Sequence, residues 1–262
     1  MNIFTAILLG IIQGLTEFLP VSSSAHLVIF QKFMGIESPG ITLEIFLHFG
    51  TLVSIFWVFR RDFIDLFSFY RNRTQGRFLA LLIIGVIPTG LIGMAFKSWV
   101  EQAFQSTLIV GFMLLITGGL LFLITRIPPG QNNISRMRFS DALWIGTLQG
   151  VAVIPGISRS GSTIVGALWR GLDRDTAVRY SFMLAAPVIL GATILETKDL
   201  ITNGVETELL LNYLSGGIFA FIFGVIAIKL FINLLQSRKF HYFSYYCWIA
   251  GSITVLLSLI LS

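Results

Sequence analysis

The chain has 262 residues, of which 55% are hydrophobic and 12% are charged. Soluble domains carry fewer apolar residues and about twice this charge, so the composition excludes an ordinary soluble protein and indicates an integral membrane protein. The net charge of +5 is explained by basic loops that face an anionic membrane surface, and we expect no nucleic-acid partner. Cys247 is the only cysteine, which excludes an intramolecular disulfide and a cysteine-based metal site.

The first predicted element is a short apolar segment, residues 3–12. A helix of this length spans only ~15 Å, half of the hydrocarbon core, before Gly14, Pro20 and the serines that follow interrupt it. Such a segment either crosses the membrane or enters it and returns on the same side. It lacks a basic n-region, so we expect no cleavable signal peptide and an N-terminus that stays in the mature protein.

Six longer apolar runs follow along the chain, each long enough to cross ~30 Å of hydrocarbon as a helix. They are continuous and lack the period-two alternation of barrel strands, which favours an all-α polytopic membrane protein with a single membrane domain, residues 1–262. The six runs are residues 41–59, 78–96, 107–125, 177–195, 209–235 and 243–261.

A second broken segment lies between the third and fourth runs and repeats the cadence of the first. Ala142, Gly146 and the pair at 149–150 stand 136 residues after Ala6, Gly10 and the pair at 13–14. The runs themselves keep nearly the same offset. The chain is therefore interpreted as two copies of one unit, a broken segment followed by three spans, with repeat 1 at about residues 1–126 and repeat 2 at about residues 137–262.

Loop charges predict the topology of these segments. The loops at 60–77, 126–141 and 238–239 are basic and belong inside the cell, whereas the acidic loop at 196–208 belongs outside. Every loop falls on its expected side only if both broken segments are re-entrant helical hairpins, with both termini outside. One hairpin and three spans make an odd number of crossings, so the two repeats are inverted and their hairpins meet near the midplane. Polar backbone at that depth predicts a cavity.

The first hairpin carries an unusual set of polar groups. Glu17 follows Gln13 by four residues, so a carboxylate and an amide share one helix face and can approach a common ligand or metal. After Pro20 come three hydroxyl groups and an imidazole within one turn. Helix capping or an interfacial position explains each group singly, but ionisable side chains at depth are costly, and together they favour a functional site. These residues are Ser22, Ser23, Ser24 and His26.

The second hairpin carries phosphate-binding chemistry. Arg159 offers a bidentate fork at the start of a helical run, where free N–H groups and the positive end of the helix dipole attract anions. The pattern is not a P-loop, since no Gly-Lys-Ser or Gly-Lys-Thr is present. A plain cytoplasmic positive charge is the weaker interpretation, because small polar residues bracket this arginine. The predicted phosphate-binding residues are Ser22, Ser24, Gly156, Ser158, Ser160, Gly161 and Ser162.

Glu44 and His48 lie four residues apart on the first long span. For both, an interfacial position and a place at the cavity remain open.

The chain resembles the bacterial undecaprenyl-pyrophosphate phosphatases, the bacitracin-resistance family. The resemblance spans the whole chain and rests on residues 13–26, which are similar to the family's acidic element and Pro-Val-Ser-Ser stretch, and on residues 155–161, which are similar to its Pro-Gly-x-Ser-Arg-Ser-Gly loop. It implies a phosphatase of the bacterial inner membrane that converts a polyprenyl diphosphate to the monophosphate, recycling the carrier of cell-wall synthesis. It also implies a divalent cation, Mg²⁺ or Ca²⁺. Our hypothesis is that Glu17, with Gln13, holds this metal or orients the base.

The resemblance implies that Glu17, His26 and Arg159 are essential and that Ser23 is the nucleophile. Our hypothesis is that Arg159 holds the phosphates while His26 removes a proton from Ser23, or from a water that attacks directly. A secondary transporter or flippase for polyprenyl phosphate is the alternative, because inverted repeats and midplane polar groups are typical of transporters as well. A non-catalytic lipid-binding scaffold is a third and weaker interpretation of the function. For the oligomeric state, the sequence leaves a homodimer open.

Overall fold

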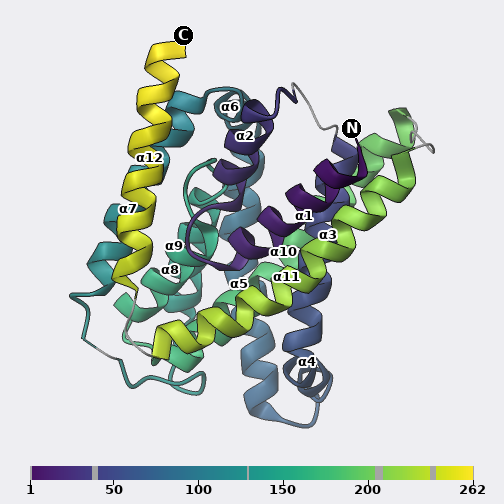
Figure 1. Ribbon diagram of the computed structural model, residues 1–262. Coiled ribbons are helices and arrows are strands. Elements are labelled where there is room, and N and C mark those ends of the chain that lie inside the picture. Colours follow the sequence, from purple (N-terminus) through teal and green to yellow (C-terminus); the bar gives the residue numbers. More distant parts are fainter. Residues whose placement is uncertain (1, 37–40, 129, 204–208, 237–239, 262) are drawn as a thin grey trace.

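The computed structural model describes residues 2–36, 41–128, 130–203, 209–236 and 240–261. In these ranges the chain forms twelve α-helices and no β-strand, apart from one isolated bridge between Asn132 and Leu172 (Figure 1). The helices in chain order are α1 (Ile3–Phe18), α2 (Ser23–Phe33), α3 (Ile41–Val58), α4 (Arg60–Leu66), α5 (Arg73–Ala95), α6 (Lys97–Phe104), α7 (Thr107–Ile124), α8 (Phe139–Val151), α9 (Arg159–Trp169), α10 (Arg174–Asn203), α11 (Leu210–Gln236) and α12 (His241–Leu261).

Five helices are long and apolar enough to cross a membrane, namely α5, α7, α10, α11 and α12. A sixth span is completed if α3 and α4, which are bent by 76° relative to each other, are taken together. The all-helical fold and the places of the six predicted runs are confirmed. Apolar side chains at one helical spacing on α5, such as Ile83, Ile87 and Leu91, are 51–59% exposed. Such outward apolar faces are expected where lipid is the solvent.

The ends of the long helices differ from the apolar runs that predicted them. Helix α10 runs from Arg174 to Asn203, so much of the predicted acidic loop at 196–208 is helical, and its last residues, 204–208, lie outside the described residues. Helix α5 begins at Arg73, where the Asn72 side chain accepts a hydrogen bond from Thr74 N at 2.9 Å. A helix ends at a capping or helix-breaking residue, whereas an apolar run shows only which part of the helix lies in hydrocarbon.

Helix α1 is longer than expected, because Gly14 does not interrupt it. The helix continues to Phe18 and ends at Leu19, which is extended as the residue before Pro20 must be. Gly14 instead lets α1 approach α11, since a Cβ on it would lie 2.6 Å from the carbonyl oxygen of Ala220. The predicted break at this glycine was therefore wrong, and the proline alone ends the helix.

The two broken segments pack in equivalent ways on opposite halves of the chain. Helix α1 lies along α11, where a Cβ on Gly10 would be 2.3 Å from the Gly216 carbonyl oxygen. Helix α8 lies along α5, where a Cβ on Gly146 would be 2.0 Å from the Gly85 carbonyl oxygen. Figure 1 shows α1 and α11 side by side, and α7 beside α12. Both broken segments are thus seated against a long helix of the other half.

The basic loops gather at one end of the molecule. Figure 1 shows α4 and the stretch between α7 and α8 at the lower end, with α6 and both marked chain ends at the upper end. The third predicted basic loop, residues 238–239, lies outside the described residues. The charge asymmetry of the sequence therefore corresponds to two ends of the helix bundle.

Candidate active site

The two broken segments meet at an ion pair between Glu17 and Arg159. Glu17 is in the last turn of α1, and Arg159 is the first residue of α9. The Glu17 Oε1 atom pairs with Arg159 Nη2, and the two side chains are only 8% and 15% exposed. Two charges that are removed from water must compensate each other, so this pair fastens the hairpins together at a buried point.

Glu17 also holds the polar groups of its own hairpin. Its Oε2 atom accepts hydrogen bonds from Ser23 Oγ at 2.6 Å and from Gln13 Nε2 at 3.0 Å. The short distance to the serine is typical of a hydroxyl that donates to a carboxylate. Both oxygens of one carboxylate therefore have partners, and the Ser23 proton already points toward a base.

The turn between α1 and α2 is strained at Ser22. This residue has φ of +67°, a left-handed conformation that non-glycine residues rarely adopt, and its Oγ accepts a hydrogen bond from Ala25 N at 3.4 Å as the N-cap of α2. Ser22 Oγ also contacts Ser24 Oγ at 3.1 Å. Strain of this kind persists only where the surroundings impose it, and it often marks functional turns. Here it turns Ser23 back toward Glu17.

His26 does not contact Ser23. Its Nδ1 atom donates to the Ser22 carbonyl oxygen at 2.7 Å, because a carbonyl can only accept, and its Nε2 atom therefore accepts from Tyr246 Oη at 2.6 Å. The Tyr246 ring also stacks on the imidazole with 5.6 Å between centroids. Both ring nitrogens are thus in use. No pattern in the sequence predicts this contact, because Tyr246 lies 220 residues from His26 along the chain.

The second hairpin is shaped by Gly156 and fastened to α7. Gly156 has φ of +99°, and a Cβ there would lie 2.5 Å from the Met113 Cβ atom. The Thr117 hydroxyl donates to the Gly156 carbonyl at 2.8 Å and accepts from Ser158 N at 3.1 Å. Ser158 then caps α9 by accepting from Gly161 N at 3.1 Å. Thr117 thereby positions Arg159, although no sequence pattern singles this threonine out.

A cavity of about 170 Å³ lies where the hairpins meet. Among the predicted residues it brings together Glu17, Ser22, Ser23, Ser24, Ser158 and Arg159. It does not include Gln13, His26, Gly156, Ser160, Gly161 or Ser162. The residues that complete its lining are Thr16, His48, Phe104, Ala152, Val153 and Ile157.

The predicted residues outside the lining have structural contacts instead. Ser160 Oγ donates to the Leu19 carbonyl at 3.3 Å, which ties α9 to the end of α1. Ser162 is buried within α9, and Gly161 contributes its N–H to the cap. His48 reaches the cavity, with Nδ1 bonded to the Glu44 carbonyl oxygen at 2.9 Å, whereas Glu44 itself is not part of the lining. Of the pair left open by the sequence, only the histidine belongs to the site.

Two buried polar atoms at this site have no hydrogen-bond partner among the described residues, Arg159 Nη1 and Gln13 Oε1. Buried polar atoms are nearly always paired, so an unpaired donor at the cavity and an unpaired acceptor beside Glu17 indicate ligands. The guanidinium donor suits a phosphate oxygen. The amide oxygen, next to a carboxylate, suits a divalent cation whose other ligands come from phosphate and water.

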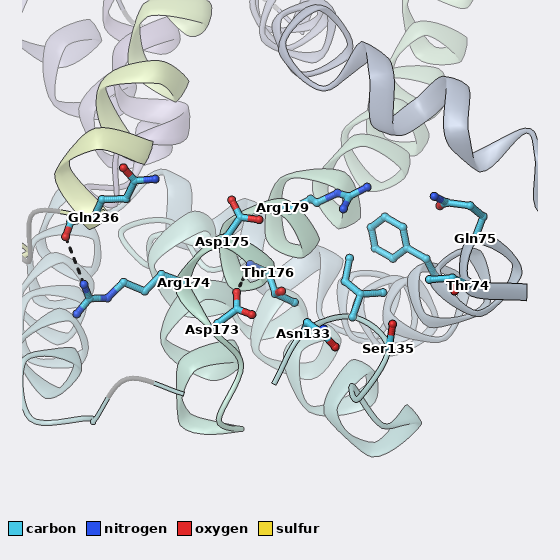
Figure 2. Close-up of a pocket in the computed structure, with 12 residues that line it drawn as sticks. Thr74, Gln75, Asn133, Ser135, Asp173, Arg174, Asp175, Thr176, Arg179 and Gln236 are labelled. Atoms are coloured by element: carbon cyan, nitrogen blue, oxygen red, sulfur yellow. Dashed lines mark hydrogen bonds between the residues drawn. The ribbon is translucent and has the colours of Figure 1, made fainter. Parts of the chain in front are cut away.

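A larger polar cavity of about 560 Å³ lies at the N-terminal end of α10 (Figure 2). Its polar groups largely serve the fold. Figure 2 shows Arg174 donating to the Gln236 carbonyl and Thr176 N donating to Asp173, and Arg179 forms an ion pair with Asp62. The lining holds no residue of the two sequence motifs. Size alone therefore does not identify the site, and the residues of both motifs line the smaller cavity.

Comparison with known proteins identifies the family to which the chain belongs. A family model described as bacitracin resistance protein BacA matches residues 6–253. The undecaprenyl-diphosphatase of Halothermothrix orenii is 48% identical over 98% of this chain and 99% of its own length. Those of Alkaliphilus metalliredigens and Rhodopirellula baltica are 45% and 42% identical, over 99% and 98% of this chain and 100% and 99% of theirs. The chain therefore belongs to the bacitracin resistance protein BacA family of membrane proteins.

Proposed function

We propose that this protein hydrolyses undecaprenyl diphosphate to undecaprenyl phosphate and inorganic phosphate, and so recycles the lipid carrier of cell-wall synthesis. The relatives reported above are named undecaprenyl-diphosphatases and cover almost the whole chain. The observation that carries the proposal is the arrangement of three side chains in one cavity: the Ser23 hydroxyl donates to Glu17, and Arg159 keeps an unpaired N–H beside them.

In the proposed mechanism Ser23 Oγ attacks the terminal phosphorus. Glu17 accepts the hydroxyl proton, and the bond from that phosphorus to the bridging oxygen breaks, with undecaprenyl phosphate as the leaving group. Arg159 stabilises the charge on the equatorial oxygens of a loose transition state. Glu17 passes the Ser23 proton to the departing undecaprenyl phosphate. The regenerated carboxylate then deprotonates a water that cleaves the bond between phosphorus and Ser23 Oγ, so that inorganic phosphate leaves and the proton from the water returns to Ser23. A direct attack by water on the substrate is the alternative, and it uses the same base.

This mechanism changes the role of His26 from base to positioning residue. Its two ring nitrogens bind the Ser22 carbonyl and the Tyr246 hydroxyl, which supports a role in holding the first turn of α2. A base must lie within hydrogen-bond reach of its proton, and for Ser23 that group is Glu17.

A divalent cation, Mg²⁺ or Ca²⁺, fits the site as part of this proposal. Glu17 and the Gln13 amide oxygen would hold it together with the substrate phosphates, in the way that Mg²⁺ is commonly bound by few protein ligands. When bound, it neutralises charge on the diphosphate.

The experiment is phosphate release from undecaprenyl diphosphate by the purified protein in detergent, with and without EDTA. We expect release that EDTA abolishes and that added Mg²⁺ or Ca²⁺ restores. No release with either cation would refute the phosphatase, and undiminished release in EDTA would refute the cation. Detergent removes any gradient, so turnover there also separates an enzyme from the alternative, a secondary transporter or flippase of polyprenyl phosphate.

We further propose that the chain is an inverted repeat with two re-entrant hairpins. Equivalent positions, 136 residues apart, line one cavity, and α7 packs antiparallel to α12, with Thr107 bonded to Ser258 at 3.0 Å and Trp248 to the Leu115 carbonyl at 3.2 Å. Antiparallel packing of equivalent helices is what inversion produces. The equivalent lining pairs are Thr16 with Ala152, Glu17 with Val153, Ser22 with Ser158, and Ser23 with Arg159.

The orientation follows from the basic loops. On this proposal the end of the molecule that carries them faces the cytoplasm under the positive-inside rule, and both termini and α6 lie at the outer face of the inner membrane. Because Phe104 of α6 lines the cavity, we propose that the cavity opens toward that outer face.

A further inference from the structure

We infer that the isoprene units next to the diphosphate bind in an apolar groove between α5, α6 and the hairpin of α8 and α9, an inference that rests on the proposed function. The groove has a volume of about 470 Å³. All of its lining residues are apolar, and they are Ile92, Phe96, Trp99, Val100, Gly150, Val151, Val153 and Ile154.

The groove adjoins the polar cavity. Val153 lines both of them, and α6 contributes to both, with Trp99 and Val100 at the groove and Phe104 at the cavity. The diphosphate is covalently joined to its chain, so a chain whose phosphates lie beside Arg159 must leave the cavity through one of its walls. The wall that the cavity shares with the apolar groove lets the polyprenyl chain leave without lying against polar side chains.

The cavity itself has a polar side and an apolar side. Its polar lining comes mainly from α1, α2 and α3, with Ser158 and Arg159 at the start of α9. Its apolar lining is Phe104, Ala152, Val153 and Ile157, and all four belong to α6 or to the turn between α8 and α9. An amphipathic substrate is therefore oriented with its chain toward the groove, since an isoprene unit placed against the serines and Arg159 would exclude water from these polar groups without offering them a hydrogen bond.

Close packing of α5 and α8 closes the groove on one side, and exposed aromatic side chains lie along its edge. A Cβ on Gly150 would lie 2.7 Å from Ile92 Cδ1, so the glycine brings α8 and α5 into contact beneath it. Phe96 and Trp99 are 55% and 43% exposed along its rim. The volume is within the ~300–1,000 Å³ typical of ligand pockets, which is enough for the first part of a long chain while the remainder lies in the bilayer.

The test varies the substrate chain as well as the protein. The variant Trp99→Ala removes one wall, and Ile154→Trp fills the groove; Trp169→Ala, at an exposed tryptophan outside both cavities, is the matched control. Hydrolysis of undecaprenyl, farnesyl and methyl diphosphates is measured for each, because methyl diphosphate has no isoprene unit to occupy the groove. We expect both groove variants to raise KM about 5-fold or more for the two longer substrates, with kcat and the KM of methyl diphosphate changed less than 2-fold.

Equal losses for long and short substrates, or no change of KM in either groove variant, would overturn the inference. A second measurement does not depend on the variants: a farnesyl diphosphate with a photoreactive group on its first isoprene unit, irradiated with the wild-type protein. Adducts within residues 92–100 or 150–154 support the groove, and adducts confined to other helices refute it. Wild-type turnover of undecaprenyl diphosphate is recorded in parallel, so failure of the phosphatase is told apart from failure of the groove.

Discussion

At the scale of single residues, the site depends on one carboxylate and one guanidinium that compensate each other out of water. Arg159 is 15% exposed and Glu17 is 8% exposed. Removal of either leaves the other charged and unpaired, which is costly in a buried setting. Conservative changes are therefore more informative than truncations, because they keep the charge and alter only its geometry.

Arg159→Lys keeps the positive charge but loses the planar fork that can serve Glu17 and a phosphate together. We expect kcat/KM for undecaprenyl diphosphate to fall about 100-fold or more, as when a preorganised transition-state donor is lost. Phosphate release in detergent measures the change. Arg170→Lys, at an arginine that is 40% exposed and pairs with the buried Asp141 outside the cavity, is the control and should stay within about 3-fold of wild type. Near-normal turnover by Arg159→Lys would remove this arginine from the mechanism.

Ser23→Ala distinguishes the two nucleophiles. If Ser23 attacks, the variant loses turnover, and acid quenching of the wild-type reaction with ³²P-labelled substrate yields phosphoserine at this position. Ser24→Ala, which also lines the cavity but has no bond to Glu17 in the structure, is the matched control and should keep at least about a tenth of the activity, since a neutral hydrogen bond contributes ~0.5–1.5 kcal/mol. An active Ser23→Ala variant would assign the attack to water.

Tyr246→Phe tests the positioning role of His26. The change removes the donor to Nε2 while keeping the stacked ring, so we expect kcat to fall about 2- to 10-fold with KM nearly unchanged. Tyr245→Phe, which is equally exposed on the same helix, should have no effect. A loss in Tyr246→Phe that appears only in KM would contradict positioning of the catalytic turn.

At the scale of helices, the hairpins are held by glycines where backbones touch. Gly10 and Gly146, equivalent in the repeat, each face a carbonyl oxygen of a long helix in the other half. Van der Waals packing and small residues drive helix association in lipid, because no hydrophobic effect operates between apolar surfaces there. The same glycines that weaken an isolated helix therefore seat α1 and α8.

Gly146→Ala should lower the thermal midpoint of the protein in detergent by several degrees and reduce turnover. The added Cβ would lie 2.0 Å from the Gly85 carbonyl oxygen, so α8 must move away from α5, and overpacking of this kind costs ~1–3 kcal/mol. Gly90→Ala is the matched control on α5, where an added Cβ meets nothing within 4 Å. It should be neutral or slightly stabilising, because alanine favours the helix. Equal midpoints for the two variants would contradict this account of the packing.

At the scale of the whole molecule, the two ends differ in charge, and the orientation in the membrane follows from that. The sole cysteine, Cys247, is buried, so the wild-type protein provides an unlabelled background for accessibility measurements. Gln102 on α6 and Ser135 before α8 are exposed near opposite ends. With a membrane-impermeant maleimide, Gln102→Cys should react in intact cells and Ser135→Cys only after permeabilisation. The reverse pattern would invert the proposed topology.

Much of this protein was predictable from sequence. Composition and run length predicted an all-helical membrane protein and the places of its spans, because burial in hydrocarbon selects apolar residues whatever the tertiary contacts. The offset of 136 residues, together with loop charge, predicted that Glu17 and Arg159 approach each other, and they form an ion pair. Polar residues inside an apolar chain are informative because their cost in lipid leaves few explanations other than function.

The tertiary structure decided which group each polar atom meets. In the structure Ser23 donates its hydrogen bond to Glu17 and not to His26. Tyr246 and Thr117 reach the site from distant helices. His48 lines the cavity, whereas Glu44 does not. Sequence periodicity shows only on which face of its own helix a residue lies. Which helices become neighbours, and how closely, depends on glycine contacts and side-chain packing that act between segments far apart in the chain.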